Sequence, residues 1–211
     1  MRLLFMLFFF SLSISNSFCQ EKEGLIRGFC KVSFPEKMWA ITHPFVAMKA
    51  WRISKQALSV TVQIKNDTLF DGDEDGGQVD AFRHTFWMAK LAQNIHPRKA
   101  WKLGLAHEKA GWIAFKKGKN SENSIHDAAA KEMDLRNNKF GIDLGKANKS
   151  YNDSRLILEV KKAISEGNVW KIVKNKNMQS LDCEGNIIPK EEYMNKWENK
   201  RCIVRSDFSP K

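Results

Sequence analysis

The 211-residue sequence lacks most of the motifs that mark familiar enzyme classes. It has no glycine-rich phosphate loop, no serine in a nucleophile elbow, no HExxH zinc motif and no internal repeat. It also has no arginine-rich run or basic stripe with interleaved aromatics, which argues against sequence-specific binding of nucleic acid. Cys30 has no helix start or neighbouring histidine in the sequence that would activate its thiol. Covalent catalysis is therefore disfavoured.

Long apolar runs are also missing beyond the N-terminus, where Arg2 precedes the apolar segment Leu3–Phe10. This segment is shorter than the roughly 20 residues that a membrane span requires, and small residues follow it. We predict a signal peptide over residues 1–19, cleavage after Cys19, and a soluble secreted or periplasmic protein. The alternative is a lipoprotein acylated at Cys19, which the bulky Phe18 disfavours.

Cleavage would leave 192 residues with 34 basic and 24 acidic side chains, a net charge of +10. This surplus favours anionic partners such as phospholipid head groups, cell-wall polymers or nucleic acid. The alternative is that lysines on helix faces only maintain solubility. We expect a helical domain over residues 20–167, with core motifs at 71–145, and a small appendage over 168–211.

Three cysteines would remain after cleavage, and disulfides persist outside the cytoplasm. Cys183 and Cys202 flank a loop-rich tail with little core of its own. We expect these two to pair and Cys30 to stay free, although three thiols leave other pairings open.

Apolar periodicity predicts a mainly α fold. The first expected helix begins at Pro44, and a separate helix covers residues 55–65. A later helix begins near Ser124 and is interrupted or capped around residues 137–138. Further helices are expected at residues 79–95, 98–116 and 154–165. Short apolar runs after Val169 predict a β-hairpin-like appendage.

Residues 71–76 read DGDEDG and match the first half of a calcium-binding loop. The twelfth position of such a loop is a bidentate glutamate, but here it is Phe82. Either a weak calcium site is completed by Asp80 or another group, or the carboxylates cap the following helix. The predicted metal ligands are Asp71, Asp73, Asp75 and Asp80.

The next two helices carry the residues best suited to chemistry. Asp80 and His84 project together from an apolar helix face. Glu108 lies on an aromatic stripe, where an ionised carboxylate requires a partner, and Arg83 is the expected one. Each histidine is a metal ligand, a general base or a satisfied core residue. The candidate catalytic residues are Arg83, His84, His107, Glu108, Asp134, Asn137 and Asn138.

These residue types suit hydrolysis. His84 or His107 would act as general base, and Glu108 or Asp134 would orient the water. Arg83 or Asn138 would stabilise developing negative charge. A divalent metal at the His/Glu site is a further possibility for this mechanism. The alternative role of residues 134–138 is a helix-capping turn, because Asp and Asn bond readily to local backbone.

The motifs DAFRHTFW (residues 80–87), AHE (106–108) and MDLRNN (133–138) resemble an uncharacterised bacterial domain family. That family occurs in secreted proteins, particularly of Bacteroidetes, and at the C-terminal ends of polymorphic-toxin-like proteins. The resemblance covers about residues 76–145 and places the candidate catalytic residues at signature positions. Arg136 departs from the pattern, in which an aromatic residue or histidine is more usual. The resemblance implies a site but no reaction.

The sequence therefore supports three hypotheses. The first is a secreted hydrolase with a buried polar site, acting on an anionic envelope polymer or lipid. The second is a non-catalytic, calcium-stabilised binding or structural module. The third is a nuclease, which would release nucleotides in proportion to added metal.

Overall fold

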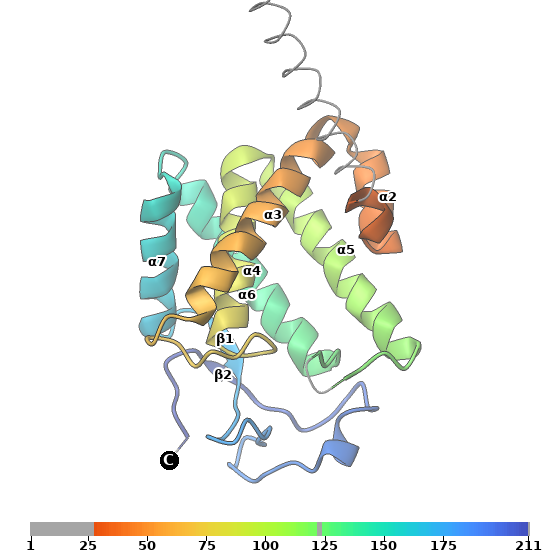
Figure 1. The fold of residues 1–211 in the computed structure, drawn as a ribbon, viewed down its shortest axis with the longest axis vertical. Coiled ribbons are helices and arrows are strands. Elements are labelled where there is room, and N and C mark those ends of the chain that lie inside the picture. Colours follow the sequence, from red (N-terminus) through yellow and green to blue (C-terminus); the bar gives the residue numbers. More distant parts are fainter. Residues whose placement is uncertain (1–27, 122–123, 211) are drawn as a thin grey trace, which may run out of the picture.

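The computed structural model describes residues 28–121 and 124–210, so the predicted signal peptide lies outside the described residues. The described residues form six α-helices followed by a short antiparallel strand pair (Figure 1). The helices are α2 (Phe34–Thr42), α3 (Pro44–Lys65), α4 (Gln78–Asn94), α5 (Pro97–Lys116), α6 (Ala128–Ala147) and α7 (Asp153–Ser165). The strands β1 (Trp170–Ile172) and β2 (Ile203–Arg205) are joined by a segment that contains the 3-10 helix η1 (Lys190–Glu192). The predicted mainly α fold is confirmed.

Helix α4 lies at the centre of the domain and packs against α3, α5, α6 and α7. Most of its residues are buried, including Phe82, Phe86 and Met88. A helix that is apolar over most of its circumference has no face to present to water, so it is surrounded by other helices. This central position carries Asp80 and His84 into the interior.

Two glycines bring α6 close to α4. A Cβ atom added at Gly141 would lie 2.3 Å from the backbone oxygen of Thr85, and one at Gly145 would lie 2.2 Å from that of Ala89. Only glycine permits this backbone approach. The close packing fixes the part of α6 that carries Asp134 and Asn138 beside His84.

Two predicted helix boundaries were wrong. Helix α3 runs without a break from Pro44 to Lys65, so no separate helix begins at residue 55. Pro44 does occupy its first turn, as predicted. Helix α6 continues through Asn137 and Asn138, whose side chains bond to distant groups instead of capping the local backbone.

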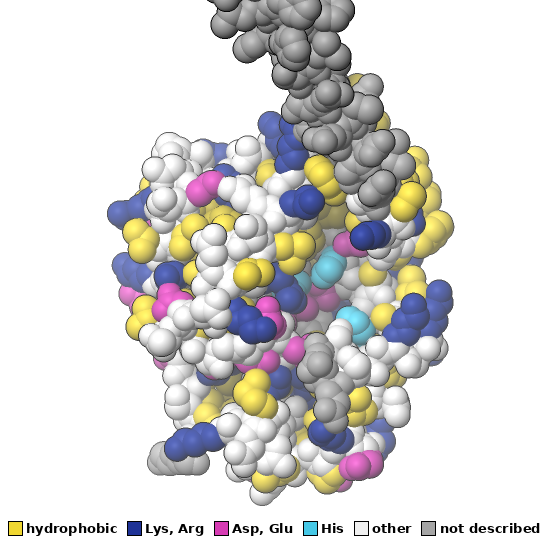
Figure 2. All heavy atoms as spheres, viewed as in Figure 1, with side chains coloured by type: hydrophobic (Ala, Val, Ile, Leu, Met, Phe, Trp, Pro, Cys, Tyr) yellow, Lys and Arg dark blue, Asp and Glu magenta, His cyan; other side chains and the backbone are white. Residues whose placement is uncertain are grey.

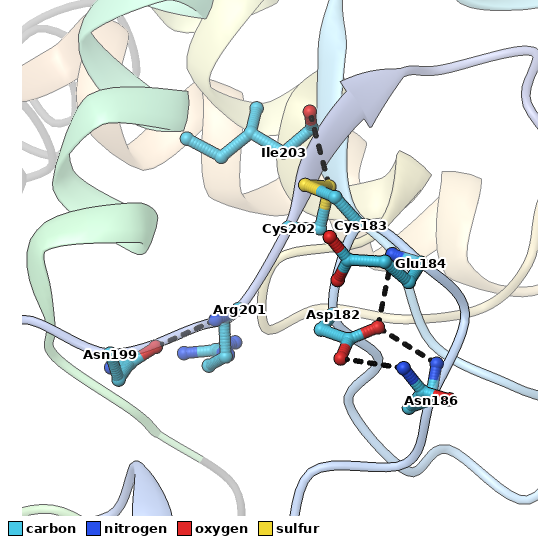
Figure 3. The surroundings of a disulfide bond; sticks show 8 residues. All are labelled: Asp182, Cys183, Glu184, Asn186, Asn199, Arg201, Cys202 and Ile203. Atoms are coloured by element: carbon cyan, nitrogen blue, oxygen red, sulfur yellow. Dashed lines mark hydrogen bonds between the residues drawn. A yellow bond between two sulfur atoms is a disulfide. The ribbon is translucent and has the colours of Figure 1, made fainter.

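The C-terminal segment packs beneath the helical bundle (Figure 1). Strands β1 and β2 are antiparallel and are joined by residues 173–202, which agrees with the predicted hairpin-like appendage. The Cys183–Cys202 disulfide tethers this segment, and Cys30 is free, as predicted (Figure 3). A buried ion pair between Arg201 and Asp127 joins the segment to the start of α6.

No helix in the described ranges is long and apolar enough to cross a membrane.

Candidate functional site

His84 is the buried centre of the site, with 1 % of its surface exposed. Its Nδ1 lies 3.1 Å from Oδ1 of Asn138, an oxygen that can only accept a hydrogen bond. Nδ1 therefore carries the proton, and the lone pair of Nε2 points the other way. That nitrogen lies 3.3 Å from Oδ1 of Asp134 and 3.4 Å from Oδ1 of Asp80.

Asp80, His84 and Asp134 bring one potential ligand atom each within 4.8 Å of one another. They form the one group of this kind in residues 28–121 and 124–210. Asp80 and His84 come from successive turns of α4, as the sequence predicted, and Asp134 comes from α6. The Oδ1 atom of Asp134 is buried and has no hydrogen-bond partner among the described residues. A lone pair that faces two carboxylate oxygens favours a proton or a metal cation between them.

Arg83 forms an ion pair with Asp80, one turn earlier in α4. Its Nη2 atom also lies 3.4 Å from Nε2 of His84. The predicted pairing of Arg83 with Glu108 was therefore wrong, because Asp80 lies on the same helix face as Arg83 and is closer. Oε1 of Glu108 is buried without a hydrogen-bond partner in the described part of the chain.

Burial and mutual repulsion shift the protonation of this cluster. Burial, together with the charges of Asp80 and Glu108, raises the pKa of Asp134 well above its usual value. Burial likewise raises the pKa of Glu108 to about 7. Burial and the charges of Arg83 and His107 hold the pKa of His84 well below its usual value. The site therefore combines a neutral imidazole with Glu108, which binds a proton near neutrality, and with Asp134, whose pKa is also raised.

His107 lies at the rim of the site, with its ring centroid 5.8 Å from that of His84. Its Nδ1 bonds to Oε1 of Glu36 at 2.9 Å. Burial opposes ionisation of Glu36, but the hydrogen bond and charge of His107 lower its pKa to about 2. Burial opposes protonation of His107 as well, yet the hydrogen bond that His107 donates to Glu36 and the charges of Glu108 and Glu36 raise its pKa. This pair holds α2 against α5.

Glu36 and His126 were not predicted from the sequence, yet they line the same cavity as His84 and His107. Glu36 is the third helical residue of a capping box that begins at Ser33. The Ser-x-x-Glu pattern could have revealed its place at a helix start, but not its contact with His107. His126 lies in an irregular segment, where no periodic signal was present.

Asn137 does not belong to the site. Its side chain donates to the backbone oxygen of Trp170 and accepts from the backbone nitrogen of the same residue, each at 2.9 Å. It therefore anchors β1 to α6. Because successive helical residues point about 100 degrees apart, Asn137 and Asn138 serve different neighbours.

The carboxylates of the predicted calcium loop point to separate partners. Asp71 accepts a hydrogen bond from the backbone nitrogen of Gln78, which matches the capping alternative. Asp73 forms an ion pair with Lys174 at 2.7 Å. Asp75 accepts from the backbone nitrogen of Ile125 at 3.1 Å. Oδ2 of Asp80 accepts from the backbone nitrogen of Gly76 in this loop at 2.7 Å, whereas its Oδ1 lies beside His84. Calcium binding by the loop remains a prediction.

The polar cluster opens into a cavity of about 540 Å³. Acidic and histidine side chains gather in a hollow on the face shown in Figure 2. Asp80, Arg83, His84, Glu108 and Asp134 all line the cavity. Its size suits a small molecule or the polar end of a larger one.

The fold and this cluster define a mainly helical domain with a buried Asp-His-Asp centre. The chain belongs to the family described as a domain of unknown function (DUF6973), which matches residues 37–168, more than half of its length. No curated protein and no solved structure matches the chain. The matched range contains Asp80, His84 and Asp134 and ends before β1.

Proposed function

We propose that the cavity is a hydrolytic site in which Asp80, His84 and Asp134 hold a divalent cation. The observation that carries the proposal is the position of His84 Nε2, which lies 3.4 Å from Oδ1 of Asp80 and 3.3 Å from Oδ1 of Asp134. Asn138 fixes the ring in this orientation, as residues behind metal-bound histidines commonly do.

Charge balance supports the cation. Asp80, Glu108 and Asp134 line one cavity, and their mutual repulsion contributes to the raised pKa of Glu108 and Asp134. A divalent ion between them would offset this repulsion. One imidazole nitrogen and two carboxylate oxygens suit Zn²⁺ or Mn²⁺.

A cation at this position would lower the pKa of bound water and polarise the bond to be cleaved. Glu108, whose pKa of about 7 suits proton transfer in both directions, accepts the proton of the water. The water oxygen bonds to the electrophilic carbon or phosphorus, and the bond to the leaving oxygen breaks. Glu108 then returns the proton to that oxygen. Arg83, which reaches the cavity from its partly exposed side, stabilises the negative charge of the substrate.

The test compares Asp134→Asn with Asp143→Asn, the same substitution at an exposed position of the same helix. Purified full-length protein is titrated with Zn²⁺ and Mn²⁺ by calorimetry and assayed on nitrophenyl carboxylate and phosphate esters. We expect Asp134→Asn to lose metal binding and ester cleavage while Asp143→Asn retains both. Absence of metal-dependent cleavage in the unmodified protein would refute the hydrolase proposal.

A non-catalytic, calcium-stabilised module is the second candidate. Its structural part is supported by the partners of Asp71, Asp73 and Asp75, which tie the loop to its surroundings. Calcium would have to replace these partners. This candidate predicts that Ca²⁺ raises the melting temperature of the full-length protein. It also predicts that Asp71→Asn abolishes that increase and that no ester is cleaved.

We also propose that the chain is an exported bacterial protein that acts on the cell envelope. The signal-like N-terminus, the Cys183–Cys202 disulfide and the resemblance to domains of secreted and polymorphic-toxin-like proteins support export. Fractionation of bacteria that express the full chain tests it. Retention of the protein in the cytoplasm with reduced cysteines would contradict it.

A further inference from the structure

Helix α2 and the beginning of α3 expose a row of large apolar side chains. Phe34 and Ile41 are 71 % and 60 % exposed, and Phe45 is 99 % exposed. Met38 and Met48 are exposed beside them. The two helices meet at His43, so these side chains form one surface, which we call the α2–α3 edge. Hydrophobic side chains also appear where Figure 1 places α2, at the upper right of Figure 2.

Basic residues flank the apolar side chains of the α2–α3 edge. Residues 29–58 contain five basic residues and only one acidic residue, Glu36, which bonds to His107 on the neighbouring helix. The basic residues are Lys31, Lys37, Lys49, Arg52 and Lys55. Exposed apolar side chains next to lysines are typical of helices that lie in the interface of an anionic membrane.

Beneath this edge lies a second cavity of about 790 Å³, lined mainly by apolar side chains. Trp39, Trp51, Trp87 and Leu103 form part of its wall. The cavity shares Arg83, His84 and His107 with the polar cavity, so the two meet at the candidate site. A protein partner would contact only the outer surface and would not require this cavity. An amphiphile, in contrast, needs an apolar channel that ends at polar groups.

We propose that the α2–α3 edge docks on a bilayer with anionic head groups and that the apolar cavity accepts an acyl chain from it. The basic residues attract the head groups, and Phe34, Ile41 and Phe45 enter the interface. The identification of this lipid as the substrate rests on the hydrolytic function proposed above. Docking itself does not depend on hydrolysis.

The test places an environment-sensitive fluorophore at position 41 through Ile41→Cys in full-length protein that also carries Cys19→Ser and Cys30→Ser. The matched control carries the fluorophore through Leu158→Cys, an exposed apolar position on α7, which lies across the bundle from α2 (Figure 1). Vesicles contain either phosphatidylglycerol or phosphatidylcholine alone. We expect a blue shift at position 41 with phosphatidylglycerol only, and none at position 158. An unchanged spectrum at position 41, or equal shifts with both lipids, would overturn the proposal.

A charge-reversal pair provides the second measurement. Lys31→Glu with Lys49→Glu should weaken binding to phosphatidylglycerol vesicles at least about tenfold. Lys176→Glu with Lys200→Glu makes the same change in net charge on the C-terminal segment and should have little effect. Equal weakening by both pairs would show that only net charge acts, contrary to the proposal.

The Asp134→Asn variant separates docking from catalysis. It should give the same blue shift at position 41 but release no product from phosphatidylglycerol. Docking without hydrolysis in the unmodified protein would refute the hydrolytic function but support the proposed docking surface. Hydrolysis of soluble esters without docking would support the hydrolytic function but refute the docking surface.

Discussion

Oδ1 of Asn138 accepts a hydrogen bond from Nδ1 of His84 at 3.1 Å, across 54 residues of sequence and between the two most closely packed helices. The bond determines which nitrogen of the imidazole faces Asp80 and Asp134. Asn138 is therefore a positioning residue for the proposed metal site.

Asn138→Ala should weaken binding of Zn²⁺ or Mn²⁺ by roughly 10- to 100-fold, because the His84 ring loses the acceptor that orients it. Calorimetric titration of the folded variant checks this. Lys139→Ala, at the next and exposed position of α6, should bind metal normally. If Asn138→Ala is less stable but binds metal with unchanged affinity, Asn138 has only a structural role.

Glu108→Gln should remove a pH dependence of stability from the metal-free protein. The pKa of Glu108 is about 7 in the folded state against 4.5 for the ordinary carboxyl. As the pH rises, the unfolded chain therefore loses the carboxyl proton of Glu108 at a lower pH than the folded protein does. The free energy of unfolding falls as the pH rises from about 4.5 to 7. For this buried group the loss is on the order of 2–3 kcal/mol. Urea unfolding with chelator present at pH 5 and pH 8 measures it, and an identical decline in Glu108→Gln would contradict the assignment.

The Glu36–His107 pair should hold α2 in place most firmly between about pH 4.5 and 6.5. The pKa of Glu36 is lowered to about 2. The contribution of Glu36 to stability is therefore complete above about pH 4.5 and is lost as the pH falls toward 2. The pKa of His107 is raised, so its contribution is complete below 6.5 and is lost as the pH rises through the folded-state value. Amide exchange in α2, corrected for intrinsic rates, should be slowest inside this window. Glu36→Gln should abolish the window, whereas Glu132→Gln at an exposed site of α6 should preserve it.

Arg201→Ala should destabilise the protein by about 3–5 kcal/mol, because it leaves Asp127 buried without its charged partner. Asp127 also caps α6 by accepting from the backbone nitrogen of Ala130 at 2.7 Å. Urea denaturation provides the measurement, and Lys200→Ala at the neighbouring exposed position is the control. A change below about 1 kcal/mol would mean that the C-terminal segment contributes little to the stability of the helical domain.

Periodicity in the sequence was sufficient to predict the mainly α fold and the shared face of Asp80 and His84. These features are local, because side chains four residues apart on a helix point the same way. The pairing of Cys183 with Cys202 was also predicted, since both cysteines flank one short tail. The motifs around His84, His107 and Asp134 indicated an uncharacterised domain family, and the match over residues 37–168 agrees with it.

The tertiary structure alone decided which of these groups meet. Asp134 and Asn138 reach His84 because Gly141 and Gly145 let α6 approach α4, a contact between distant segments that periodicity does not encode. Arg83 forms an ion pair with Asp80 and not with Glu108, and the side chain of Asn137 bonds to the backbone of Trp170. Helix packing determines which of these neighbours is nearest. The sequence by itself determined the helices and the residue types of the site. Only the packing of α4 against α6 decided that the imidazole of His84 faces the carboxylates of both Asp80 and Asp134.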